Sequence, residues 1–318
     1  MPSICQNIKT EYEHLQDLKE RFSLEFALAQ KSGNLKAVKK LKYEWEAAYA
    51  ALEAKLYVSV EEAREILGKE NVFGSKEVEK TWGVRLAEVP YIPFSAEELE
   101  RAKELGQMLV LRVNKTAEGK PMSMEAMNAI LVGTEKNPGK WQKAGKGGLL
   151  DSVDDWERWI GEDFFTKETP RSGWALVSKD VLPVSINKDE LEQTEIIISA
   201  LRKNAFKEID LPQEYAEAIA EFESKKAELA SLIDENWNEM KRQLSALKIT
   251  QLTRQTIPEI VYDVAIYYDR SNERLLSDDY TLSATLSIIG HFDASGVDHM
   301  WHPDNRYGGL GVSLSSRL

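Results

Sequence analysis

Apolar residues recur at three- and four-residue steps along much of this 318-residue chain, a spacing that places them on one face of an α-helix. Within residues 6–57 the step appears twice, on either side of the Ser-Gly-Asn sequence at 32–34. Glycine and asparagine accept the left-handed backbone that lets a chain reverse after a helix. The pattern predicts a helical hairpin over 6–57, and a hairpin of this length is expected to pack like a coiled-coil arm.

The same helical step returns over residues 189–207 and 212–247, where it predicts two long helices joined as a second antiparallel hairpin. Pro258, at the first helical position, then opens a shorter helix that extends to Tyr268. Apolar residues occupy most sides of this shorter helix, so we expect it to be buried.

Local signals mark two short helices between Ser59 and Gly83. Ser59 and Ser75 are the expected N-caps, and Ser59 forms a capping box with Glu62. Gly68 and Gly83 stand where glycines end helices. The pair is similar to a small helix-turn-helix. Its acidic content argues against DNA recognition, which needs basic or amide side chains facing the groove.

Two short apolar runs, MLVLRV at 108–113 and GWALVSK at 173–179, predict strands that pair with each other. Ser95 and Glu98 form a second capping box and begin a helix before the first of these strands. Residues 137–150 are rich in Gly and Lys and predict a loop, but they lack the order of Gly and Lys that a P-loop requires.

The helical step ends after Ser271 and Asn272, and from Leu282 apolar residues alternate at about every second position, which predicts short strands separated by turns with Gly and Asp. The fold class expected from these patterns is α+β, with a mainly helical body and a small mixed sheet. We expect four parts: an N-terminal helical hairpin at 1–57, a small α+β domain at 58–187, a long helical hairpin at 188–256, and a C-terminal module of short strands at 257–318.

Composition narrows the choice of partner. The net charge of -12 repels phosphate backbones, so we expect no nucleic acid to bind. No apolar run of about 18 residues exists, so no membrane span is expected. The single cysteine, Cys5, excludes an intramolecular disulfide, and the first residues lack the pattern of a signal peptide. These features predict a cytoplasmic protein.

The last 44 residues differ in composition from the rest of the chain. No lysine follows Lys248, and three of the four histidines, His291, His299 and His302, lie near the C-terminus. Ser, Asp, Asn, Tyr and Gly surround them, and these residue types favour recognition surfaces, where lysine and glutamate are depleted. The composition indicates binding before it indicates catalysis.

The sequence IIGHFDASGVDHMWHPDNRYGGLGVSLSSR, at 288–317, resembles the C-terminal variable segment of the target proteins of diversity-generating retroelements, in the form found in candidate-phylum bacteria. In that family a reverse transcriptase rewrites chosen codons near the end of the gene. The resemblance implies that the C-terminal module has a C-type-lectin-like fold and displays the rewritten residues to a ligand.

The resemblance divides the module into two sets of residues. The framework positions, expected to build the core and turns, are Gly290, Phe292, Asp293, Gly296, Trp301, Pro303, Leu310, Gly311, Val312 and Arg317. The display positions, expected to face a ligand, are Ser287, His291, Asp298, His299, His302, Asp304, Asn305, Arg306, Tyr307 and Ser313. On this interpretation the protein is a non-enzymatic, receptor- or adhesin-like binder of an unknown protein or glycan, without a cofactor or a bound metal.

Two alternatives stay open. Because helical hairpins make up much of the length, the chain can instead be a scaffold or assembly protein, and the N-terminal hairpin can join copies into a homo-oligomer. The histidines, together with Asp293, Asp298 and Asp304, also offer enough ligands for zinc or iron, which would make a metal-dependent enzyme. Their spacing matches no helix-borne metal motif.

Overall fold

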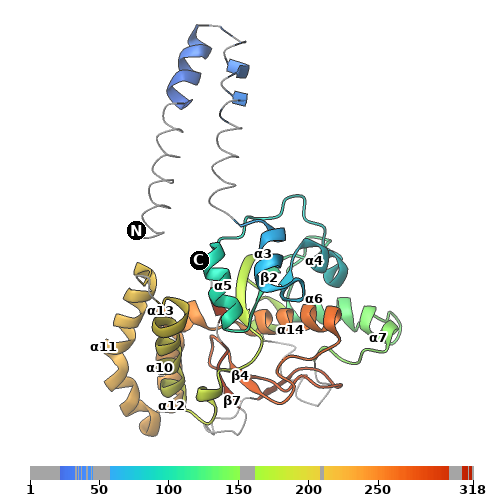
Figure 1. Ribbon diagram of the computed structural model, residues 1–318. Helices are drawn as coiled ribbons and strands as arrows, with labels where there is room; N and C mark the ends of the chain where they lie inside the picture. Colours follow the sequence, from blue (N-terminus) through green and yellow to red (C-terminus); the bar gives the residue numbers. More distant parts are fainter. Residues whose placement is uncertain are drawn as a thin grey trace.

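The computed structural model describes residues 58–150, 162–207, 211–300, 310–313 and 315–316, and part of 22–45. The expected fold class is confirmed, because helices and two small mixed sheets make an α+β protein. Figure 1 shows a layer of helices on one side, formed by α10 to α13, and a second group of helices around the sheets on the other. No helix among the described residues is long and apolar enough to cross a membrane.

The N-terminal hairpin is described only near its turn. Residues 22–31 are helical, and helical residues follow the turn between 36 and 45. The rings of Phe22 and Trp45 stack with centroids 5.0 Å apart, so the two segments lie side by side as the sequence predicts. Most of the predicted hairpin over 6–57 lies outside the described residues.

The main sheet has the strand order β1-β2-β3-β8. Its strands are β1 (Val72–Phe73), β2 (Gln107–Arg112), β3 (Gly173–Ser178) and β8 (Ser315–Ser316). β2 and β3 pair antiparallel over six residue pairs, from Gln107–Ser178 to Arg112–Gly173, which confirms the predicted pairing. β8 joins the edge of β3, so residues 315–316 are part of the sheet of the body.

Three capped helices cover this sheet, namely α3 (Val60–Leu67), α4 (Ser75–Trp82) and α5 (Ala96–Glu104). The predicted capping boxes at Ser59 and Ser95 are both present. The expected N-cap at Ser75 is wrong by one residue. Gly74 occupies the cap, because the Glu77 carboxylate accepts a hydrogen bond from the Gly74 N–H and closes the turn one residue earlier.

Shorter elements complete the first half of the chain: η1 (Lys69–Asn71), α6 (Met124–Leu131), α7 (Lys140–Ala144), α9 (Asp163–Thr166) and η2 (Pro183–Ser185). α7 lies within the Gly-rich segment at 137–150 that the sequence predicts to be a loop. Trp141, fully buried, anchors this extra turn of helix.

Helix α14 (Ile257–Ser271) is the central element of the main hydrophobic core. Thirteen of its residues, from Ile257 to Asp269, are buried, which confirms the expected burial. Thr256 caps the helix with Glu259, so Pro258 is the second helical residue and not the first. The same core contains side chains of α3, β2 and β3 and of Ile289 and Phe292, so it crosses the expected boundary at residue 257.

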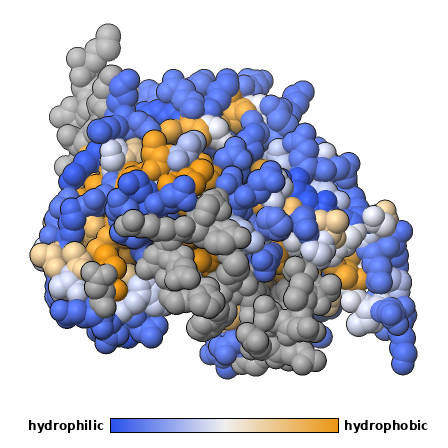
Figure 2. All heavy atoms as spheres, turned by 90° about the horizontal axis from the view of Figure 1, so that it is seen from below, coloured by the Kyte–Doolittle hydropathy of each residue, from blue (hydrophilic) through white to orange (hydrophobic). Residues whose placement is uncertain are grey.

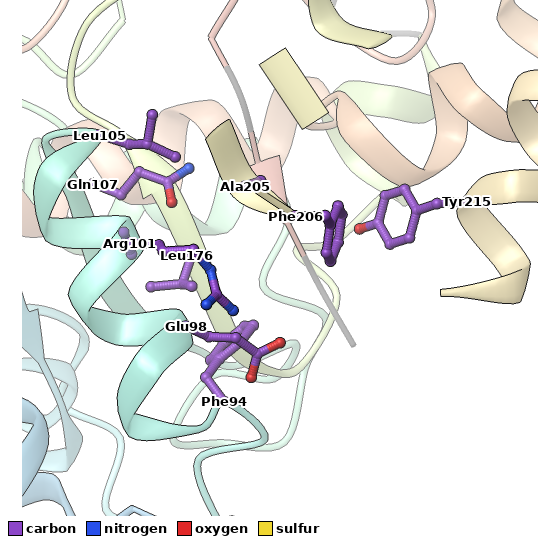
Figure 3. A pocket seen from close by; sticks show the side chains of 10 residues that line it. Phe94, Glu98, Arg101, Leu105, Gln107, Leu176, Ala205, Phe206 and Tyr215 are labelled. Atoms are coloured by element: carbon purple, nitrogen blue, oxygen red, sulfur yellow. The ribbon is translucent and has the colours of Figure 1, made fainter. Parts of the chain in front are cut away.

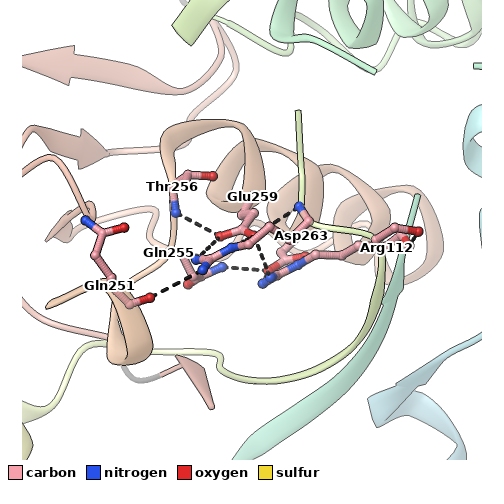
Figure 4. A network of polar contacts seen from close by, with 8 residues as sticks. Arg112, Gln251, Gln255, Thr256, Glu259 and Asp263 are labelled. Carbon is pink, nitrogen blue, oxygen red and sulfur yellow. Dashed lines mark hydrogen bonds and ion pairs between the residues drawn. The ribbon is translucent and has the colours of Figure 1, made fainter. Parts of the chain in front are cut away.

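A buried network of charges joins this helix to the main sheet (Figure 4). Arg112 at the end of β2 forms ion pairs with Asp263 and Glu259 of α14, and all three side chains are at most 2% exposed. Glu259 also accepts hydrogen bonds from the Arg171 backbone N–H and from its Nε, at 3.1 and 3.0 Å. Two guanidinium groups thus balance two carboxylates, which limits the cost of burying the charges.

The second core belongs to the helical layer. Its elements are α10 (Glu190–Ala200), the π-helical turn η3 (Leu201–Ala205), α11 (Gln213–Glu235), α12 (Trp237–Ala246) and α13 (Lys248–Thr253). The prediction of one helix over 212–247 is wrong, because the chain reverses at Asn236. The Asn236 side chain accepts a hydrogen bond from the Glu239 N–H and caps α12. After this break the Lys248 backbone N–H reaches Glu221 of α11, so α11 and α12 form the hairpin.

The second sheet has the order β6-β5-β4-β7 and is formed by the C-terminal segment. Its strands are β4 (Tyr280–Leu282), β5 (Ile288–Gly290), β6 (Asp298–Met300) and β7 (Leu310–Gly311). β4, β5 and β6 pair antiparallel in sequence, whereas β7 returns parallel to β4. The short strands agree with the predicted alternation, and a C-type-lectin-like module stays a prediction.

Candidate functional site

The candidate site is the β4–β7 sheet and the turns that join its strands, because this segment contains the display positions. Tyr280, Gly290 and Asp298 stand opposite one another on three adjacent strands. The Tyr280 hydroxyl donates a hydrogen bond to Asp298 Oδ2 over 3.0 Å, across the strand between them. The imidazole of His291 lies nearly parallel to the Tyr280 ring, with centroids 5.7 Å apart and an interplanar angle of 8°.

Gly290 makes this arrangement possible. A Cβ at this position would lie 2.3 Å from the Asp279 carbonyl oxygen, closer than any side chain tolerates. The next residue, His291, has a φ of 46°, a left-handed conformation that asparagine, aspartate and histidine adopt more often than other side chains. The local backbone therefore turns the exposed imidazole back over Tyr280.

A cluster of hydroxyl groups lies at the turn between β4 and β5. Ser283 Oγ and Thr285 Oγ1 are 2.9 Å apart, and Thr285 Oγ1 donates to Ser287 Oγ over 3.3 Å. The Ser287 N–H donates back to Ser283 Oγ over 3.1 Å. Hydroxyl groups both donate and accept hydrogen bonds, so this partly exposed cluster suits a polar ligand.

The turn after β5 is held by Asp293. Its Oδ1 accepts hydrogen bonds from the backbone N–H and the hydroxyl of Ser295, at 2.7 and 2.5 Å. These bonds hold the pKa of the Asp293 carboxyl below its ordinary value, so the group stays ionised at neutral pH. Gly296, with a φ of 136°, closes the turn in a conformation that only glycine adopts easily.

The Gly-rich segment at 147–150 packs directly against this turn. An added Cβ at Gly147 would lie 2.5 Å from the Ala294 carbonyl oxygen, and one at Gly148 would lie 2.1 Å from that of Ser295. The Val297 N–H donates to the Leu149 carbonyl over 2.9 Å, and Leu150 forms a parallel bridge with Val297. Glycine at 147 and 148 therefore lets this segment approach the backbone of the turn after β5 closely.

Arg274 ties the two segments together from one side. Its Nε donates to the Asp293 carbonyl over 2.6 Å, and its Nη2 donates to the Lys146 carbonyl over 3.0 Å. The guanidinium also lies over the rings of Tyr268 and Phe292, at 4.1 and 5.0 Å from their centroids. One cation thus fixes the turn after β5 to the Gly-rich segment and to α14.

Most framework positions within the described residues are buried. The buried ones are Gly290, Phe292, Gly296, Leu310, Gly311 and Val312. Asp293 is exposed but fixes its turn, as a framework residue does. Trp301, Pro303 and Arg317 lie outside the described residues.

The display positions differ from one another in exposure. His291 is exposed, and Ser287 and Asp298 are partly exposed. His299 is the middle residue of β6, opposite Ile289. Ser313 differs from its expected exposure, because it is only 6% exposed and its hydroxyl lies 3.1 Å from Thr281 Oγ1. His302, Asp304, Asn305, Arg306 and Tyr307 lie outside the described residues.

The metal alternative gains no geometric support within the described residues. In that part of the chain, no three His, Cys, Asp or Glu side chains come together as metal ligands would. His291 faces the Tyr280 ring, and Asp298 accepts the hydrogen bond of the same tyrosine.

Sequence reasoning missed Tyr280, Arg274 and the two glycines at 147 and 148. The local sequence around Tyr280 carries a signal, since it begins a run in which apolar and hydroxyl residues alternate. Arg274 and the glycines carry no such signal, because their partners are 19 or more residues away in the chain.

The side of the molecule on which β4 and β7 lie in Figure 1 is the face seen in Figure 2. Several groups of hydrophobic residues lie among hydrophilic residues on this face. Val184 of η2, the segment beside β7, is 70% exposed.

Comparisons of the chain with protein-family models, with curated proteins and with solved structures give no match.

Proposed function

We propose that the protein is a non-enzymatic binder that presents a diversified C-terminal surface to a protein or glycan ligand. The observation that supports this most strongly is how the C-terminal segment is built into the body. Phe292 and Ile289 lie in the core around α14, and β8 extends the main sheet. The display positions His291 and Asp298, which are exposed and partly exposed, belong to none of the hydrophobic cores, so their side chains can change without removing a core contact.

Two further observations agree with this proposal. The exposed and partly exposed display positions His291, Asp298 and Ser287 carry aromatic, acidic and hydroxyl groups, which suit adaptable polar contacts. Gly290, Asp293 and Gly296 fix the backbone between them, so the surface is organised before a ligand arrives. A preorganised surface loses less conformational entropy on binding.

The experiment compares the protein with a variant in which His299, Asn305 and Tyr307 are all replaced by alanine. Both proteins are applied to arrays of glycans and of bacterial surface proteins. We expect the native chain to bind a subset of array members and the variant to lose that binding, with Tm unchanged within about 2 °C. A variant with Glu100→Ala and Lys103→Ala, exposed on α5, is the matched control and should bind like the native chain.

A large loss of stability in the triple variant would place those residues in the core and contradict the proposal that they are displayed to a ligand.

The genomic context offers an independent test. We expect a reverse-transcriptase gene near the coding gene, with a near-copy of the last part of that gene that differs at adenines.

One observation also favours self-association through the N-terminal hairpin. Leu24, Leu28 and Tyr43 are 68%, 61% and 74% exposed, and the two leucines stand four residues apart on one helix face. A second copy of the hairpin would cover this face.

Sedimentation of the native chain should show a dimer or larger species, and Leu24→Glu with Leu28→Lys should convert it to monomer. A native chain that sediments as a monomer would refute self-association.

A further inference from the structure

The helical layer contains a buried arginine whose hydrogen-bond donors are only partly matched. Arg254 follows α13 directly and is 1% exposed. Its Nη2 donates a hydrogen bond to Thr194 Oγ1 of α10 over 3.2 Å. Its Nε and Nη1 are also buried, and neither has an acceptor in the described part of the chain. Buried guanidinium groups nearly always have partners, because leaving a donor without one costs free energy.

The carboxylate that interacts with this arginine is that of Glu190, which begins α10 and is 4% exposed. Burial lowers the pKa of Arg254 to about 10, and the negative charge of Glu190 opposes that change. Glu190 Oε2, however, is buried without a donor among the described residues. The two charges therefore lie close enough to influence each other, yet no hydrogen bond joins them.

The indole of Trp237 adds a third group, from α12. Its Nε1 is buried and has no acceptor within the residues that the structure describes. Burial raises the pKa of the Glu190 carboxyl, and Arg254 and Trp237 both oppose that rise, so both groups lie near the same carboxylate. The other charged groups there are Lys241, whose Nζ lies 5.1 Å from the centre of the Trp237 ring, and Asp189, whose carboxylate caps α10.

The directions of the unmatched donors decide which ligand fits this cluster. The Nε–H and Nη1–H bonds of a guanidinium group point from different edges of its plane, so one monatomic anion cannot accept from both. Water accepts from such donors and also donates to a carboxylate, and an internal water typically forms about three hydrogen bonds to buried polar groups. We propose that ordered water molecules bridge Arg254, Trp237 and Glu190 inside the helical layer, as a structural ligand of α10, α12 and α13.

Room for water exists at another guanidinium group beside the same layer (Figure 3). The pocket between α5, β2 and the rings of Phe206 and Tyr215 has a cavity volume of about 30 Å³. A water molecule needs about 10–15 Å³ of such space. The Nε of Arg101, which lines this pocket, is buried without an acceptor in the described part of the chain. In this protein an unmatched guanidinium nitrogen thus coincides with a space of the size of water.

The water site lies where the helical layer meets the candidate site. Gln255, the residue after Arg254, accepts a hydrogen bond through its carbonyl from the Ala284 N–H over 2.7 Å. Ala284 belongs to the turn between β4 and β5, which carries the cluster of hydroxyl groups. Bridging water therefore holds the end of α13, and with it the backbone that supports this turn.

The test is a crystal structure of the full-length native protein, at a resolution that shows ordered water, from crystals soaked in sodium bromide. We expect electron density for water within about 3.2 Å of Nε or Nη1 of Arg254, bonded in turn to Glu190 Oε2, and no anomalous signal of bromide there. A direct ion pair between Arg254 and Glu190 without water would overturn the proposal. A bromide peak at the guanidinium would also overturn it and would assign the site to an anion.

Contacts with water in solution provide a second measurement with a matched control. The Trp237 Nε1–H should give a cross-peak to water in NOE spectra of isotope-labelled protein, with the sign of a water that stays bound while the protein tumbles. Trp141 is the control, because its buried Nε1 donates to Asp269 Oδ1 over 3.1 Å and should give no such cross-peak. Equal signals from the two indoles, or none, would contradict bridging water.

Glu190→Met combined with Arg254→Met separates the water site from ordinary helix packing. Apolar replacement of both partners of a buried charge pair often leaves stability nearly unchanged, so this variant should fold. The Trp237 cross-peak should disappear, and the Ala284 amide should exchange its hydrogen faster. Lys241→Gln should keep the cross-peak, which excludes a signal relayed through the ammonium group. An unchanged cross-peak in the double variant would overturn the assignment of water to Arg254 and Glu190.

Discussion

Arg112 donates a hydrogen bond from Nε to Oδ1 of Asp263 over 3.0 Å, although 151 residues separate them in the chain. Both side chains are almost completely buried. Burial opposes the charge of Arg112, but Asp263 and Glu259 outweigh it and raise the pKa of the guanidinium above its ordinary value. This pair fixes the end of β2 against α14, and through α14 it fixes the segment that leads to the candidate site.

Replacement of Asp263 by asparagine should therefore destabilise the protein strongly. Arg112 would keep its charge in the core with only Glu259 to balance it, so we expect a loss of about 3 kcal/mol in the free energy of unfolding. Urea denaturation followed by circular dichroism measures this loss. Lys167→Gln, which breaks an exposed ion pair with Asp163, should leave the midpoint nearly unchanged. A loss below about 1 kcal/mol for Asp263→Asn would contradict the argument.

Local sequence rules predicted the elements that depend on neighbouring residues. The capping boxes at Ser59 and Ser95 and the existence of strands β2 and β3 follow from caps and apolar runs within ten residues. The break at Asn236 also had a local signal, since Glu239 follows three residues later as in a cap. The apolar stripe of 212–247 continues through the break, so the periodicity alone predicts one uninterrupted helix.

Contacts between distant segments could not be predicted in this way. The core around α14 joins side chains from Ala63 to Val297, and no periodicity within a segment reports such a connection. The same reason explains why the burial of Ser313 was not predicted. Its polar side chain predicts exposure, but Thr281, 32 residues earlier, supplies a buried partner.

Asp269 should control the stability of the protein at acid pH. Burial disfavours its charge, but Lys140, Trp141 and Lys146 outweigh burial and lower the pKa of the carboxyl below its ordinary value. The unfolded chain holds this proton with a pKa of about 3.9. The stability that ionised Asp269 contributes is therefore complete above that value and is lost as pH falls through the lower folded value.

Asp269→Asn should accordingly cost about 2 kcal/mol at pH 7, because hydrogen bonds from Lys140 and Trp141 lose their ionised acceptor. The difference between the native chain and this variant should shrink as pH falls below about 4. Urea midpoints measured between pH 7 and pH 3 give this difference. A gap that stays constant, or widens, towards acid pH would show that the lowered pKa does not stabilise the fold.

Gly148 should be required for the close approach of the Gly-rich segment to the turn after β5. In Gly148→Ala the new Cβ would meet the Ser295 carbonyl oxygen at 2.1 Å, and backbone on both sides prevents a small adjustment. We expect a loss of about 1–3 kcal/mol in stability, as for other overpacked sites. Hydrogen exchange should locate the loosening at the Val297 amide, which bonds to Leu149.

Gly74→Ala is the matched control for this variant. Gly74 also lacks a left-handed backbone, and its nearest neighbour to an added Cβ is Trp174 at 3.5 Å, an ordinary contact. Its effect should stay well below that of Gly148→Ala, and equal losses in the two variants would argue that close approach at Gly148 does not matter.

Ser313 should affect stability and not binding, contrary to what its place among the display positions predicts. Its N–H donates to Thr281 Oγ1 over 3.0 Å, and the two hydroxyl groups lie 3.1 Å apart within the protein. Ser313→Ala removes only the bond between hydroxyls, so we expect a loss of about 1 kcal/mol in the free energy of unfolding. The array pattern should match that of the native chain, whereas His291→Ala should change the pattern at unaltered stability. A change of pattern in Ser313→Ala without a loss of stability would return this serine to the binding surface.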